Sequence, residues 1–268
     1  MKIPKHENKA ERLAWLHANK SEQIQFKKMA LKFGDAVITP ESEQMTTKGI
    51  YSQHTDDLEK GEIKRDLVAN TYNWLDSHGD VHVGKTFKKS ISERAKKVLH
   101  LHDHKHEVMA KVGEFENIKE VEVAWTDLGV AKEGTTTVLL ATSKIQARRN
   151  KNIFDQYLNK EIDQHSVGMR YVDIQLAIGE EEYEEEYKVW KQYIDQIGNR
   201  EDAEKQGYFW AVKEAKLEEI SAVLWGSNSI TPTVENIEPP LGTQKTEPPL
   251  GTQNTKIDWA KVVQNVKF

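Results

Sequence analysis

Hydrophobic and polar positions follow two different periods along the first 230 residues. Within 8–33, apolar residues return at roughly helical spacing among Lys, Glu and Gln, and Gly34 is placed to end the helix that this pattern predicts. This helix either packs on the body or forms an arm or removable pro-segment. Farther on the period shortens and β-branched residues accumulate, which predicts strands at 81–84, 98–112, 121–125, 135–142, 166–178, 208–214 and 217–224. The pattern alone therefore predicts a mixed α and β domain.

Two further helices are expected inside the strand-rich part. Ser143 and Gln146 fit a capping box, which predicts a helix that continues to about residue 161. A very acidic stretch at about 180–206 carries an apolar seam at steps of four and three, and so predicts a helix inserted between two strands. We expect this insertion either to pack on the body or to dock another protein.

The character of the chain changes after about residue 230. The sequence Glu-Pro-Pro-Leu-Gly-Thr-Gln at 238–244 recurs at 247–253, and such a repeat predicts an extended linker without a core. We therefore expect an N-terminal helical arm at 1–40, a main domain at 41–230, and a linker with a short C-terminal peptide at 231–268.

Composition narrows the class of protein further. The 268 residues carry a net charge of −5 and no long basic patch, so a nucleic-acid partner is not expected. Apolar runs stay far below the roughly 18 residues of a membrane span, and no secretory signal is expected at the N-terminus. Because the chain has no cysteine, disulfides, thiolate metal sites and a cysteine nucleophile are excluded.

Two features carry candidate chemistry. His100, His102, His104 and His106 alternate along a predicted strand, where they would share one face. They favour a metal site, a merely polar strand, or one histidine that acts as a general base. A base needs a nucleophile, and Ser166 begins a β-rich segment beside Gly168, whose small size would leave room for a substrate carbonyl. The sequence contains no Gly-x-Ser-x-Gly elbow, P-loop or His-Glu-x-x-His motif.

Four segments in order resemble the prohead protease family of tailed phages, which is similar in fold to the herpesvirus assemblin proteases. Residues 76–90 contain an Asp, a Gly-Asp pair, and then a Gly and a Phe, and 101–112 resembles the segment of the family's catalytic histidine. Ser-Val-Gly-Met at 166–169 resembles the nucleophile strand, and Leu-Glu-Glu-Ile-Ser-Ala-Val at 217–223 resembles the strand of the third triad residue. The resemblance covers roughly 60–230.

The resemblance implies an α+β fold with a herpesvirus-protease-like β-barrel core, flanking helices and a flexible C-terminal tail. It implies a serine endopeptidase with Ser166 as nucleophile, His104 as base and Glu219 as third member, with His102 as the alternative base. No cofactor and no metal are expected. Backbone amides near Ser166 or the side chain of Arg170 are the candidate oxyanion donors.

By the same resemblance, the partners would be the major capsid protein, the scaffold or delta domain, and the protease itself, all inside the phage prohead in the host cytoplasm. No nucleic acid and no membrane are expected as partners. Two alternatives remain open: a catalytically inactive assembly or scaffold protein on the same fold, and a histidine-rich metal-binding protein.

Overall fold

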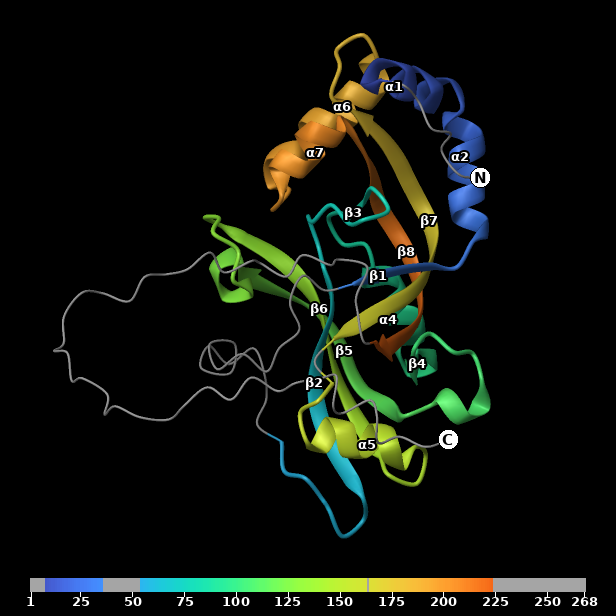
Figure 1. Ribbon diagram of the computed structural model, residues 1–268, viewed down its shortest axis with the longest axis vertical. Helices are drawn as coiled ribbons and strands as arrows, with labels where there is room; N and C mark the ends of the chain where they lie inside the picture. Colours follow the sequence, from blue (N-terminus) through green and yellow to red (C-terminus); the bar gives the residue numbers. More distant parts are fainter. Residues whose placement is uncertain (1–7, 36–53, 163, 224–268) are drawn as a thin grey trace, which may run out of the picture. The chain divides into compact units, whose positions relative to one another are not determined.

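The computed structural model describes residues 8–35, 54–162 and 164–223, which all belong to one compact unit, Met1–Thr231 (Figure 1). The predicted linker and C-terminal peptide at 231–268 lie outside the described residues. In chain order the helices and strands are α1 (Lys9–Ala18), α2 (Lys20–Met29), β1 (Lys32–Asp35), β2 (Glu62–Thr71), β3 (Asp80–His82), α4 (Lys88–Arg94), β4 (Leu99–His102), β5 (Gly113–Ala124), β6 (Thr135–Gln146), α5 (Lys151–Leu158), β7 (His165–Ile178), α6 (Glu184–Tyr193), α7 (Arg200–Gln206) and β8 (Tyr208–Ala222).

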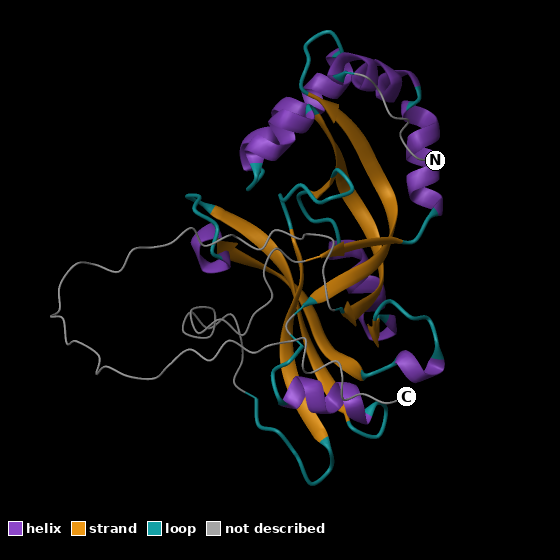
Figure 2. Cartoon of the chain, in the orientation of Figure 1, coloured by secondary structure: helices purple, strands orange, loops and turns teal. Residues whose placement is uncertain are grey.

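One mixed sheet organises this unit, in the order β1-β7-β8-β4-β5-β6-β2. The long strands β7 and β8 run antiparallel over almost their whole length, while β3 and β4 both lie parallel to β8. The sheet curls into a half-barrel, and helices flank it (Figures 1 and 2). The expected α+β class is confirmed. Strand β8 joins the pair β1-β7 to the strands β4-β5-β6-β2.

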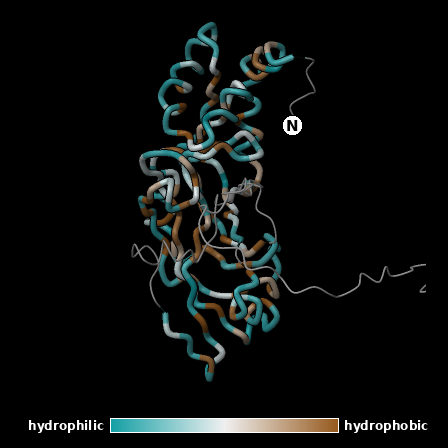
Figure 3. Tube along the Cα trace, turned by 60° about the vertical axis from the view of Figure 1, so that its left-hand side comes forward, coloured by the Kyte–Doolittle hydropathy of each residue, from teal (hydrophilic) through white to brown (hydrophobic). Residues whose placement is uncertain are grey.

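The core forms where hydrophobic side chains from the strands meet, and hydrophobic and hydrophilic residues interleave along the chain (Figure 3). The largest cluster joins β7 and β8 to the N-terminal arm, because it includes the buried Leu13 and Leu16 of α1 together with buried residues of both strands. Complete burial of a leucine side chain contributes about 1.5–3 kcal/mol. The arm is therefore packed on the sheet.

The prediction of one helix over 8–33 is wrong in two places. The helix is divided at Asn19, whose side-chain amide donates to the Trp15 carbonyl and whose backbone leaves the helical region. Residues 32–35 then form β1, which pairs antiparallel with β7. The backbone hydrogen bonds that β7 offers at its edge stabilise an extended conformation, which the local sequence alone does not predict.

The capping box predicted at Ser143 and Gln146 is also wrong, since both residues belong to β6. Gln146 lies opposite Glu62 of β2, and β6 pairs with β5 on its other side, so ladders on both edges keep this segment extended. Helix α5 begins only at Lys151, where the Asn150 side chain accepts from the backbone N–H of Ile153.

Several strand predictions differ from the structure in their bounds; β5, for example, already begins at Gly113 and not at 121. Residues 208–222 form one strand, β8, where two were expected, because β7 pairs with it throughout. Of the segment 98–112, only β4 is a strand. The predicted acidic helix is confirmed as α6, and α7 follows it before β8.

Candidate active site

The loop after β4 places His104 beside the neighbouring strand β8. Asp103 and His104 both have left-handed backbone angles, φ 52° and 53°, a region in which Asp and His are enriched among non-glycine residues. The turn is held where the Asp103 N–H donates to the Ala222 carbonyl and the Lys105 N–H donates to the His102 carbonyl. His104 therefore lies on a turn, and the expectation that four histidines line one strand face is wrong.

The structure brings the three predicted site residues together. His104 Nε2 lies 2.9 Å from Ser166 Oγ on β7, and His104 Nδ1 lies 2.5 Å from Glu219 Oε1 on β8. An ionised carboxylate only accepts hydrogen bonds, so Nδ1 carries the proton and Nε2 is left to accept from the serine hydroxyl. This is the arrangement of a serine nucleophile, a general base and an orienting carboxylate.

Their order in the sheet explains why residues distant in sequence meet. Strand β8 lies between β7 and β4, so Glu219 stands between the strand of Ser166 and the strand that leads to His104. The Glu219 side chain lies over Gly168 of β7, which is its direct partner in the β7–β8 register. A Cβ atom at Gly168 would overlap Glu219 Oε1. The space beside Gly168, expected to admit a substrate carbonyl, is thus filled by the Glu219 carboxylate.

Ser221 is a further polar residue of this site that sequence reasoning missed. Its hydroxyl donates to Glu219 Oε2 at 2.6 Å and accepts from the backbone N–H of His104 at 3.2 Å. Both Glu219 and Ser221 are fully buried, so these hydrogen bonds are shielded from water. Strand alternation could have found it, because residues two apart on β8 share a face.

A second set of polar side chains lies nearby and contains two other histidines. His100 Nδ1 is 2.7 Å from Ser143 Oγ, its Nε2 is 3.1 Å from Tyr157 Oη, and Tyr157 Oη is 2.8 Å from His165 Nε2. Burial lowers the pKa of His100 well below its ordinary value, and lowers that of His165 to about 3. At neutral pH both rings stay uncharged, so this set of residues holds the sheet together and α5 against it.

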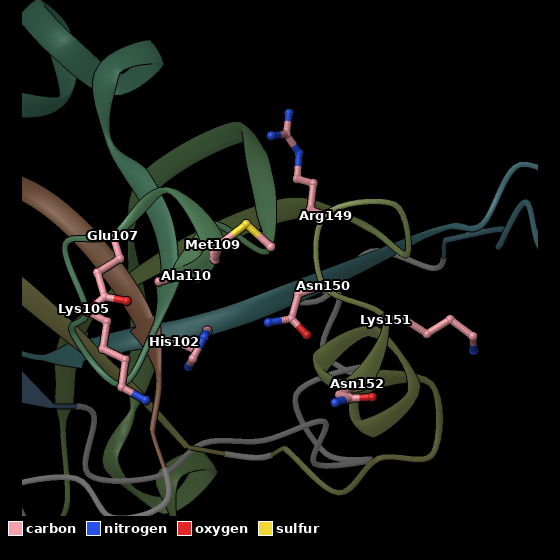
Figure 4. A pocket seen from close by; sticks show the side chains of 9 residues that line it. All are labelled: His102, Lys105, Glu107, Met109, Ala110, Arg149, Asn150, Lys151 and Asn152. Carbon is pink, nitrogen blue, oxygen red and sulfur yellow. The ribbon is translucent and has the colours of Figure 1, made fainter.

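Two hollows flank His102, the alternative base. The one in Figure 4 is lined on one side by Lys105, Met109 and neighbouring residues, and on the other by Arg149 and the start of α5. Its cations are compensated: Lys105, Arg149 and Lys151 each form an ion pair with an acidic residue. Ser166, His104 and Glu219 line neither hollow. His102 pairs with Asp103, whereas His104 Nε2 faces Ser166 Oγ, so the geometry favours His104 as the base.

A metal site finds no support in the described part of the chain. Within 8–35, 54–162 and 164–223, no group of three or more His, Asp or Glu side chains is placed to hold a metal ion. The histidines that suggested such a site point into different surroundings, as His100 is buried and His102 borders the hollows.

Strand β1 covers Ser166, the predicted nucleophile. Gly34 lies opposite Val167, Asp35 lies opposite Ser166, and only 1% of Ser166 is exposed. Ser166 Oγ is 3.5 Å from the Gly34 carbonyl oxygen, and the centroid of the Phe33 ring is 3.9 Å from that of His104. Arg170, a predicted oxyanion donor, instead donates to the carbonyl of Met29 at the end of α2.

None of the helices in the described ranges combines the length and apolar character that a membrane span requires.

The chain was compared with family models, curated proteins and solved structures. No family model matches the chain, and no curated protein or solved structure matches it.

Proposed function

We propose that this chain is a serine endopeptidase whose nucleophile is Ser166. The observation that carries the proposal is the continuous hydrogen-bonded series from Ser166 Oγ through both ring nitrogens of His104 to Glu219. Each member has one geometric role that hydrolysis of an acyl bond requires, and each comes from a different strand or its adjoining turn.

The chemistry follows from the positions of the protons. His104 Nε2 takes the proton of Ser166 as Oγ attacks the peptide carbonyl, and then returns it to the leaving amine. Glu219 accepts the hydrogen bond from Nδ1–H of His104 and stabilises the imidazolium that forms between these steps. Water then attacks the acyl-serine, again with His104 as base, which releases the acid and restores the serine hydroxyl.

The surroundings of Glu219 fix its carboxylate in place. One oxygen accepts from His104 Nδ1 and the other from the Ser221 hydroxyl, so both oxygens of this fully buried carboxylate have a donor. A buried charge without such partners would be costly, and removal of one partner would leave it uncompensated. The pair of donors therefore supports Glu219 as the orienting residue.

The biological setting that we propose rests on the resemblance of 60–230 to the prohead proteases. The fold would be an assemblin-like barrel, and the curled half-barrel sheet is compatible with such a fold. The substrates would be the major capsid protein, the scaffold or delta domain, and the chain itself, cleaved within the prohead in the host cytoplasm.

Co-expression with the capsid protein tests this function. Intact masses are followed over time for the wild type, for Ser166→Ala, and for Ser143→Ala as a matched control in the second histidine–serine pair. We expect processing in the wild type and in Ser143→Ala, and none in Ser166→Ala. Identical processing in all three, or none despite assembled shells, would contradict it.

One observation favours a second candidate, an inactive assembly protein on the same fold. Ser166 is only 1% exposed and β1 pairs with β7 at this position, so a substrate has no access to the serine in this structure. Such cover would have no cost in a protein that no longer uses the serine. On this alternative, assembly of shells would depend on the chain but would be unchanged in Ser166→Ala.

A further inference from the structure

Strand β1 binds to the edge of β7 in the way that an extended peptide binds to a sheet edge. It runs antiparallel to β7 over four paired positions, from Lys32 opposite Met169 to Asp35 opposite Ser166. β7 is paired with β8 on its other edge, so β1 takes the one edge of the nucleophile strand from which another strand could approach.

The contacts of β1 reach the reacting groups themselves. The Gly34 carbonyl oxygen lies 3.5 Å from Ser166 Oγ, and the Phe33 ring lies against the ring of His104. Gly34 fits closely, since a Cβ atom there would come within 2.9 Å of Met169 Cε and 3.0 Å of His82 Cε1. A substrate carbonyl cannot reach Ser166 while these residues remain in place.

The arm that carries β1 is anchored by specific polar contacts as well as by its buried leucines. Lys27 of α2 forms a buried ion pair with Asp80, whose other oxygen accepts from Tyr171 Oη at 2.7 Å. Lys20 pairs with Glu186 of α6 at 2.5 Å. The anchored helices position β1, so its occupation of the β7 edge is part of the fold of the unit.

From these contacts we propose that β1 is a built-in blocking strand: residues 32–35 occupy the peptide-binding edge of β7 and shield Ser166 from other peptides until they leave it. This inference rests on the proposed serine endopeptidase function. Release requires only that β1 separates from β7, because the contacts of α1 and α2 lie on other residues.

A fluorophosphonate probe tests this proposal in the full-length chain. The probe reacts with an activated serine, forming an Oγ–phosphorus bond and releasing fluoride, and its rate reports access to Ser166. Gly34→Pro removes a backbone N–H that a paired strand uses, and its ring would crowd Met169 and His82, so both effects should drive β1 away from β7. We expect Gly34→Pro to react at least about tenfold faster than the wild type, because the competent fraction sets the rate.

Met29→Ala is the matched control, since this exposed side chain of the arm lies three residues before β1 and should leave the rate unchanged. Equal Ser166-dependent rates in the wild type and in Gly34→Pro would overturn the blocking role while leaving the protease intact. A signal no higher than that of Ser166→Ala in every variant would instead overturn the nucleophile, and the blocking role with it.

Amide hydrogen exchange guards against a folding artefact. In Gly34→Pro, exchange should rise in β1 and along the β7 edge, while β8 stays protected as in the wild type. Phe33→Ala provides a second variant with a smaller increase in labelling. Faster exchange at the β7 edge without faster labelling in either variant would also overturn the proposal.

Discussion

The molecule contains two histidine–serine pairs that look alike at first inspection. In one, His104 Nε2 lies 2.9 Å from Ser166 Oγ, and in the other, His100 Nδ1 lies 2.7 Å from Ser143 Oγ. Strand β4 or the turn after it supplies the histidine in both cases. The shorter distance belongs to the pair to which we assign no chemistry, so distance between the two side chains does not identify a nucleophile.

The difference lies in the other nitrogen of each ring. His104 Nδ1 faces the carboxylate of Glu219, whereas His100 Nε2 faces the neutral hydroxyl of Tyr157. An imidazolium at His104 would have a compensating charge within 2.5 Å, while one at His100 would stand in a fully buried site, and burial holds the pKa of His100 down. A carboxylate is what turns a structural pair into a candidate base and nucleophile.

Removal of the carboxylate charge should therefore make the two pairs alike. We expect Glu219→Gln to lower kcat/KM by roughly 10²–10⁴-fold, since the amide no longer stabilises the imidazolium or selects its tautomer. Hydrolysis of a peptide spanning a mapped cleavage site measures this loss. Glu218→Gln is the control, because that neighbouring residue pairs with Arg94 and Lys216 outside the site. Equal losses in both variants would argue against a special role for Glu219.

Gly168→Ala tests whether the carboxylate needs the space opposite it. The added methyl group overlaps Glu219 Oε1, so the carboxylate should leave His104, and we expect a roughly 10²-fold loss of kcat/KM. Overpacking also costs about 1–3 kcal/mol of stability, which denaturant unfolding measures. A folded Gly168→Ala chain with full activity would show that Glu219 is not required in this position.

A smaller effect is expected from the hydroxyl that links Glu219 to the His104 backbone. Ser221→Ala removes two hydrogen bonds of the site, and we expect kcat/KM to fall by about tenfold, in line with about 1 kcal/mol for a hydrogen bond. Ser221→Thr keeps the hydroxyl and should restore most of the activity. Equal losses in both variants would assign Ser221 a packing role only.

The second set of polar residues should govern stability in acid and not activity. The pKa of His165 falls from an ordinary 6.5 to about 3, so the unfolded chain binds the proton first as the pH drops. This contribution is complete above about pH 6.5 and is lost progressively toward pH 3, at about 1.4 kcal/mol for each pH unit and on the order of 5 kcal/mol in all.

Urea unfolding at several pH values in the wild type and in His165→Gln checks this expectation. Glutamine can still bond to Tyr157 Oη but does not titrate, so the variant should lose less stability between pH 6.5 and 4. The buried His82 titrates in both chains and cancels in the comparison, whereas the charge of His165 also lowers the pKa of His100, so the difference reports the coupled His100 and His165 rings. Parallel pH profiles would show that His165 does not cause the loss.

Local sequence signals predicted much of the sheet but not its edges. Accumulated β-branched and other strand-favouring residues located β7 and most of β6, because such residues pack well on the buried faces of a sheet. The capping-box pattern at Ser143 failed because two strand partners override a local helix preference. Strand β1 escaped prediction because its conformation depends on β7, more than 130 residues away in the chain.

For the site, sequence could propose Ser166, His104 and Glu219, but not how they meet. The left-handed turn that places His104 depends on hydrogen bonds to β8, and the position of Ser221 depends on the same strand. Gly168 was expected to leave space for a substrate carbonyl, but it makes room for the Glu219 side chain. Only the fold shows that Glu219 is its neighbour across the sheet.

The most direct test of the central claim is to locate the adduct after reaction with a fluorophosphonate. The full-length Gly34→Pro chain is treated with the probe, digested and analysed by tandem mass spectrometry, beside the same chain with His104→Ala and with His100→Ala. We predict one adduct, on Ser166, which disappears with His104→Ala and persists with His100→Ala. An adduct on Ser143 or another serine, or labelling of Ser166 that does not depend on His104, would contradict the account.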